Sequence, residues 1–78
     1  MKFHKLDDNW RELRDGNLFI QVKVYEEGSR FGINNGRVSK LFVTRDGKTK
    51  ISYDRGWDVQ PNTMEDGDLL IDILNHFP

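Results

Sequence analysis

The stretch RFGINNGRVSKLFVTRDGKTKISYDRGWD, from Arg30 to Asp58, decides the fold. It holds a loop, a strand over residues 37–44, a turn, a second strand over 48–53 and a second loop. Asp46-Gly47 between two β-rich runs is typical of a β-hairpin. Most of the side chains able to bind or react also lie in this stretch, so the rest of the chain is expected to cover the hairpin.

The length of the turn determines which side chains face inward. A two-residue Asp46-Gly47 loop pairs Lys40 with Tyr53 and places this lysine among apolar residues. A three-residue loop from Arg45 to Gly47, with a bulge and left-handed Gly47, pairs Leu41 with Ile51 and Ser39 with Tyr53. The second register is favoured because it buries no lysine. It turns Leu41, Val43, Ile51 and Tyr53 inward and Lys40, Phe42 and Lys50 outward.

Outside the hairpin, residues 17–27 show the clearest strand pattern. The aliphatic residues Leu18, Ile20, Val22 and Val24 alternate with aromatic and polar residues. This alternation predicts a half-buried strand with its aliphatic set facing the core. The opposite set carries Phe19, Tyr25 and Lys23. Residues 10–14 predict a short edge strand, and residues 1–9 a mobile arm or a short first strand.

The end of the chain predicts one helix. Thr63 followed by Asp66 resembles a capping box, and acidic residues favour the positive end of a helix dipole. An apolar stripe follows at helical spacing: Leu69, Leu70, Ile73, Leu74 and Phe77. The expected fold is a single α+β domain over residues 1–78, in which an antiparallel sheet of three to five strands carries one C-terminal helix on one face.

Composition excludes several classes of protein. The 78 residues include no cysteine, so disulfides, thiolate metal sites and thiol nucleophiles are excluded. The first ten residues contain no apolar signal-peptide core, and no apolar run approaches a membrane-spanning length. We expect a cytoplasmic protein with no membrane association.

Charge is unevenly distributed along the chain. Residues 30–55 carry a net charge of +5 and residues 56–78 a net charge of −5, within a total of −1. This pattern fits a basic hairpin beside an acidic helix in one fold. It also fits two molecular faces of opposite sign.

Enzymatic chemistry has little support. His4 and His76 lie near opposite ends, without a Ser, Asp or Glu at the spacing of a catalytic dyad. Asp66, Asp68 and Asp72 lack the calcium-loop pattern and are interpreted as helix N-terminal charge. There is no P-loop or dinucleotide motif, although Gly32, Gly36 and their neighbours resemble a weak phosphate nest. We therefore expect no enzyme activity, no cofactor and no metal.

The sheet face without a helix is the stronger candidate for function. Phe19, Tyr25 and Phe42 stand there among Lys23, Lys40 and Lys50. Aromatic residues between lysines suit single-stranded nucleic acid, and aromatic residues are also enriched where proteins bind one another. Alternatively, Trp10 and the N-terminal arm cover this face as a second small core, or it mediates self-association.

Two motifs carry a resemblance to a known family. GINNGRVSKL (residues 32–41) and YDRGWD (residues 53–58) resemble motifs of small uncharacterised proteins from Gram-positive bacteria, their phages and mobile elements, described as a domain of unknown function. The similarity covers roughly residues 18–75 and implies an accessory, partner-binding role without supplying an activity.

The site candidates come from these motifs and from the second face. Residues matching the motifs are Arg37, Ser39, Lys40, Tyr53, Asp54, Arg55 and Trp57, and the face adds Phe42 and Lys50. Their structural alternatives are Asp54 bonding the Asn34–Gly36 turn or pairing with a nearby arginine, and Trp57 closing the core end. The favoured function is a non-enzymatic module that binds a protein through residues 30–58. The alternative is binding of nucleic acid or nucleotide phosphate through Arg37, Lys40, Lys48, Lys50 and Arg55.

Overall fold

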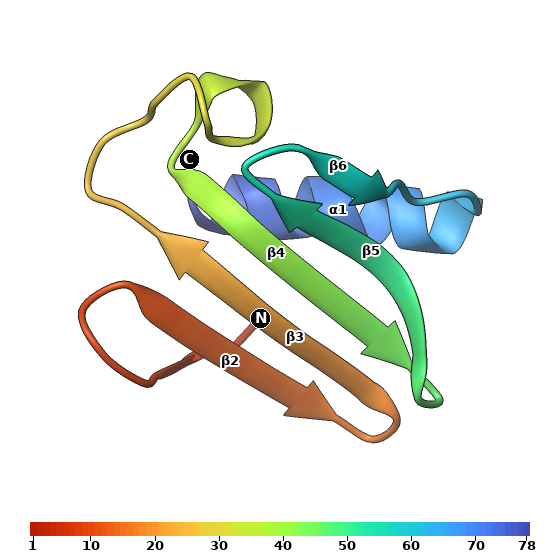
Figure 1. The fold of residues 1–78 in the computed structure, drawn as a ribbon. Coiled ribbons are helices and arrows are strands. Elements are labelled where there is room, and N and C mark those ends of the chain that lie inside the picture. Colours follow the sequence, from red (N-terminus) through yellow and green to blue (C-terminus); the bar gives the residue numbers. More distant parts are fainter.

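The computed structural model describes residues 1–78 as one antiparallel sheet with a helix behind it (Figure 1). The six strands are hydrogen-bonded in chain order. They are β1 (His4–Lys5), β2 (Trp10–Asp15), β3 (Leu18–Val24), β4 (Val38–Arg45), β5 (Lys48–Asp54) and β6 (Trp57–Val59). A 3-10 turn, η1 (Ile33–Asn35), interrupts the β3–β4 connection, and the helix α1 spans Met64–His76.

The expected class is confirmed, but the expected strand number is wrong. The sheet has six strands instead of three to five: the two-residue β1 is the short first strand considered for residues 1–9, and the three-residue edge strand β6 was not predicted. Segments this short carry no alternation that a sequence pattern can detect. The β3–β4 connection contains no strand, and Ile33 begins the 3-10 turn η1 within it.

The N-terminal residues form the short first strand and also reach the helix. The Leu6 amide donates to the Trp10 carbonyl at 3.0 Å, and β1 pairs with β2. The Phe3 ring lies 5.0 Å from Phe77 and 5.1 Å from His76, so this segment packs on the helix side. It therefore does not cover the opposite face of the sheet.

The core lies between the sheet and α1. Ile20, Val22, Leu41, Val43 and Ile51 are fully buried, and Ile73 is the helix residue that joins them. The remaining residues of the predicted helical stripe pack around this cluster: Leu69, Leu70, Leu74 and Phe77. Burying one such aliphatic side chain stabilises the fold by about 1.5–3 kcal/mol.

The hairpin turn differs from the expected three-residue loop. Arg45 pairs with Lys48, so the loop is Asp46-Gly47, and both residues have positive φ (55° and 75°), as in a type I′ turn. The expected pairs are also wrong, since Leu41 lies opposite Tyr53 and Val43 opposite Ile51.

The expected faces survive because of a bulge. Thr44 pairs with Thr49 while Val43 pairs with Ile51, so Lys50 is an extra residue in β5. This extra residue shifts the alternation by one. It keeps Lys40 out of the core despite the short loop, and Ser52 rather than Ile51 lies opposite Phe42.

Arg45 fastens the start of the helix to the end of β4. Its Nη1 lies 3.0 Å from Glu65 Oε1, and its Nη2 lies 3.2 Å from Asp66 Oδ1. Asp66 is buried, and its backbone amide donates to Thr63 Oγ1 at 3.1 Å, as the capping pattern predicts. The basic hairpin and acidic helix thus meet at this point.

We predict that Arg45→Met lowers the free energy of unfolding by about 2–3 kcal/mol, because the buried Asp66 carboxylate loses its cation. The loss stays below that of a fully buried pair, since the Arg45 side chain is 28% exposed. Urea denaturation measures the change. Glu65→Gln is the matched control and costs less than about 0.5 kcal/mol, because Glu65 is well exposed. Equal losses in both variants would contradict this account.

Candidate functional site

The sheet face opposite α1, called here the outer face, is centred on two aromatic rings. Trp10 of β2 and Phe42 of β4 stack across β3 with ring centroids 6.5 Å apart and planes 17° apart. Trp10 pairs with Lys23 and Phe42 with Gln21, which places both rings on the side away from the core. Both residues are only half-buried. A flat aromatic surface therefore remains accessible on this face.

The charges around these rings have partners within the chain. The Arg14 guanidinium lies 4.0 Å from the Phe19 ring centroid, and Arg14 Nε lies 3.5 Å from Glu12 Oε2. Lys40 Nζ lies 3.3 Å from Asp54 Oδ1. Cations engaged in this way form a polar border around the rings.

A second β-bulge shapes one end of the outer face. Lys23 pairs with Lys40 and Val24 with Val38, so Ser39 is an extra residue in β4. Its backbone carbonyl accepts a 3.1 Å hydrogen bond from the Arg55 amide. Ser39 is 5% exposed, and its Oγ has no hydrogen-bond partner.

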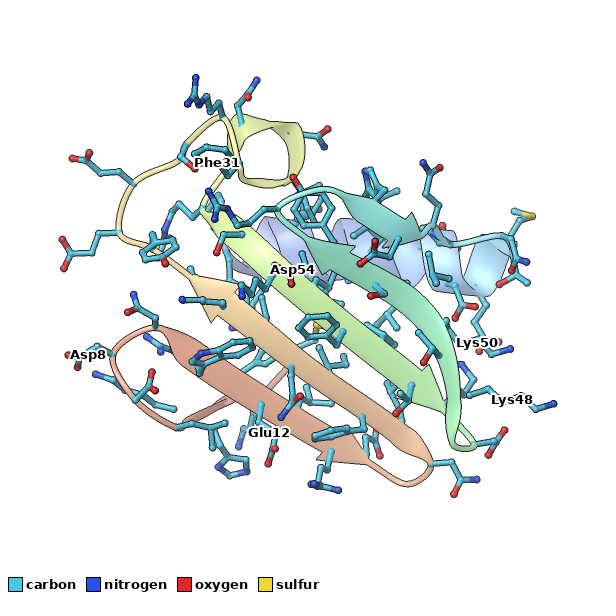
Figure 2. All side chains as sticks on the ribbon, in the orientation of Figure 1. Asp8, Glu12, Phe31, Lys48, Lys50 and Asp54 are labelled. Carbon is cyan, nitrogen blue, oxygen red and sulfur yellow. The ribbon has the colours of Figure 1, made fainter.

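The loop of residues 25–37 folds back on itself beside this bulge. The Ser29 amide donates to the Gly36 carbonyl at 3.2 Å, and Tyr53 Oη donates to the Phe31 carbonyl at 2.7 Å. A Cβ at Gly32 would overlap the Gly36 carbonyl oxygen, so this close approach requires glycine. These contacts fix the loop at the upper edge of the outer face. Phe31, which is labelled in Figure 2, marks its position.

The loop and the sheet enclose a hollow of about 460 Å³. It is lined by Lys23, Tyr25, Glu27, Ser29, Phe31, Ser39, Lys40 and Arg55. Three of these side chains are cationic and one is anionic. Lys23 Nζ lies 5.3 Å from the Tyr25 ring centroid, and the Arg55 guanidinium lies 4.4 Å from that of Phe31.

The structure brings together three of the predicted site residues, Ser39, Lys40 and Arg55, in this hollow. Phe42 lies on the same face at the centre of the sheet. Lys50 is the bulged residue of β5, and Figure 2 shows it near Lys48, away from that centre.

The other predicted residues have structural contacts. Arg37 Nε donates to the Tyr25 carbonyl at 2.8 Å, and the Tyr53 hydroxyl holds the loop. Trp57 packs edge-on against Tyr53 with centroids 5.0 Å apart and remains 37% exposed, so it covers Tyr53 without entering the core. Asp54 pairs with Lys40, so both suggested alternatives, a bond to the turn and an arginine partner, are wrong.

The phosphate nest considered at Gly32 and Gly36 does not form. The Gly32 amide donates to the Ser29 carbonyl at 3.0 Å and the Gly36 amide to Ile33 at 2.9 Å. These donors are used within the loop and are not available to an anion.

Sequence reasoning missed Phe31, Glu27 and Ser29 as lining residues. The alternation in residues 17–27 places Lys23 and Tyr25 correctly on the outer face. No periodicity extends into the loop, however, so nothing in the sequence locates its side chains over the sheet.

Neither histidine joins a reactive group. The His76 ring packs against Phe77 with centroids 4.7 Å apart, and His4 lies opposite Glu12 at the sheet edge. No group of three or more His, Asp or Glu side chains is arranged to hold a metal ion. The only α-helix, α1, has 13 residues and does not qualify as a membrane span.

A protein-family model described as "Domain of unknown function (DUF7678)" matches residues 9–78. The chain belongs to this family. The DUF7678 match begins one residue before β2 and leaves out β1. It confirms the expected kind of family, an uncharacterised domain. No curated protein and no solved structure matches the chain.

A short turn positions Trp10 at the start of β2. The Asp7 carboxylate accepts hydrogen bonds from the backbone amides of Asn9 at 2.9 Å and Trp10 at 2.8 Å. These bonds, with the Trp10 amide contributing most, hold the pKa of Asp7 below its ordinary value of 3.8. They favour the ionised form.

We predict that this turn loosens in acid. Because the pKa is lowered on folding, the turn's stabilisation is complete above pH 3.8 and is lost as the pH falls through the lowered pKa. An NMR titration of the Asp7 carboxyl carbon and the Trp10 amide measures both changes in step. In the control Asp7→Asn the Trp10 response disappears. A carboxyl midpoint at or above 3.8 would contradict the role of these hydrogen bonds.

Proposed function

We propose that this chain is a non-enzymatic binding module that engages a protein partner through the outer face. The stacked, half-buried Trp10–Phe42 pair at the centre of that face carries the proposal. The stretch of residues 30–58 supplies the central strand β4 and its neighbour β5. The opposite face already carries α1 and the core, so the outer face is the extended surface left without a covering layer (Figure 1).

The distribution of side chains supports a protein as the ligand. Protein interfaces are aromatic at the centre and polar at the rim, and tryptophan contributes strongly to binding energy. Here two rings occupy the centre, and the surrounding cations Arg14 and Lys40 contact Glu12, Phe19 and Asp54. Such charges orient a partner more than they attract a polyanion.

The resemblance to uncharacterised proteins of Gram-positive bacteria and their phages suggests an accessory role, which favours a cytoplasmic bacterial protein as the partner. A second copy of this chain is the other occupant that the proposal includes. Two outer faces meeting around a two-fold axis would place aromatic rings against aromatic rings.

Nucleic-acid binding through the basic hairpin has less support. Of its five cations, Arg37 bonds the Tyr25 carbonyl, Lys40 pairs with Asp54, and Lys48 lies at the far end of β5 (Figure 2). They do not line one continuous groove. Affinity for a single strand that falls steeply with salt concentration would favour this alternative.

We predict that Phe42→Ala abolishes partner capture. Removing a ring at the centre of an interface typically weakens binding by about 30-fold. The wild type, Phe42→Ala and a control variant, Ile71→Ala, are tagged and used to capture proteins from a bacterial lysate. Light scattering over a range of concentrations detects self-association. Ile71→Ala is the matched control, because it also truncates an exposed apolar residue but lies on the helix.

The expected result is a partner, or a dimer, present with the wild type and Ile71→Ala and lost with Phe42→Ala. Thermal unfolding confirms that both variants are folded. Retention of the same partner by Phe42→Ala would overturn the proposal. So would a wild type that captures nothing and stays monomeric at every concentration.

A further inference from the structure

The hollow beside the Ser39 bulge combines a buried, unpartnered hydroxyl with cationic lining residues, as an anion-binding site would. Ser39 Oγ is buried and unpartnered, and Ser39 is among the residues that line the hollow. A buried hydroxyl without a partner loses stabilisation that a bound acceptor would restore. Ser39 is the extra residue of the β4 bulge and has no paired residue in β3.

Cations line the same hollow as Ser39. Lys23, Lys40 and Arg55 come from three separate segments of the chain, and Glu27 is the single acid lining the hollow. Asp54 offsets part of the charge by pairing with Lys40. The remaining excess of positive charge favours a compact anion, and phosphate accepts several charge-assisted hydrogen bonds from such a set.

Aromatic and polar groups extend the hollow beyond the cations. Tyr25 is 42% exposed and Phe31 38% exposed. Guanidinium groups of Arg30 and Arg55 lie over the Phe31 ring at 4.9 Å and 4.4 Å, whereas Lys23 Nζ is the one cation over the Tyr25 ring, at 5.3 Å. Tyr25 is therefore the freer ring for stacking. Glu27 and Ser29 add hydrogen-bond acceptors. The volume of about 460 Å³ lies in the range of small-molecule sites.

We propose that this hollow binds a nucleoside monophosphate. Lys23, Lys40, Arg55 and the Ser39 hydroxyl hold the phosphate, and the base stacks on Tyr25. Glu27 accepts from the sugar hydroxyls or the base amino group, which a phosphotyrosine would not offer. Of the five cations that the sequence suggests for binding nucleotide phosphate, this proposal uses two, Lys40 and Arg55. It is independent of a protein partner at Phe42, which does not line the hollow.

Isothermal titration at low salt tests the proposal with adenosine monophosphate and guanosine monophosphate. Adenosine, inorganic phosphate, phosphotyrosine and a thymidine oligonucleotide are the comparison probes. We expect at least one nucleoside monophosphate to bind about tenfold or more tightly than inorganic phosphate, and adenosine not to bind, since both halves of the ligand contribute. Absence of binding by both monophosphates overturns the proposal. So does equal or tighter binding of inorganic phosphate, phosphotyrosine or the oligonucleotide.

Variants separate binding from folding. Arg55→Gln weakens monophosphate binding by about tenfold, as expected for a lost charge-assisted bond. Arg30→Gln is the control. Arg30 also lies over the Phe31 ring but does not line the hollow, so this substitution leaves the affinity unchanged. Ser39→Ala weakens binding several-fold without lowering the unfolding midpoint, because the hydroxyl has no partner in the protein. Unchanged affinity in both Arg55→Gln and Ser39→Ala would overturn the assignment.

Discussion

Two β-bulges in the central hairpin determine which side chains face the helix and which face outward. The Asp46-Gly47 turn alone would pair Lys40 with Tyr53 and direct a lysine toward the core. The extra residue Lys50 corrects this alternation, so that Leu41 and Tyr53 pair on the helix side. The tight turn and the apolar core are compatible only because β5 carries one residue more than β4 in this interval.

The second bulge links the fold to the candidate sites. Ser39 interrupts β4 where the sheet meets the loop of residues 25–37, and the Arg55 amide bonds its carbonyl. Tyr53 also reaches this region. Its ring packs in the core, and its hydroxyl donates a hydrogen bond to the loop. The central aromatic pair and the hollow thus share one rigid frame, held behind by α1 and by the Arg45–Asp66 pair.

Local patterns made much of this fold predictable. The alternation from Leu18 to Val24 and the helical stripe that includes Ile73 reflect burial directly, and the Thr63 cap acts within one turn. Contacts between distant segments were not predictable. Arg45 gives no sign in the sequence that it meets Asp66, because that pairing depends on the angle at which the helix crosses the sheet.

The site was predictable only in part for the same reason. Ser39, Lys40 and Arg55 stand out in the motifs, but Phe31 joins them only because the loop folds back. Bulges are also invisible to an alternation rule, which explains why the faces were correct while the expected pairs and loop length were wrong. The alternation rule also gives no sign that Lys50 is the residue that the bulge inserts.

Cross-strand backbone contacts between β4 and β5, measured by NMR, test the bulged register most directly. The account predicts nuclear Overhauser contacts that place Phe42 opposite Ser52 and Leu41 opposite Tyr53. Contacts placing Phe42 opposite Ile51, or Leu41 opposite Ile51, would contradict it. Either register would change the set of side chains assigned to the outer face.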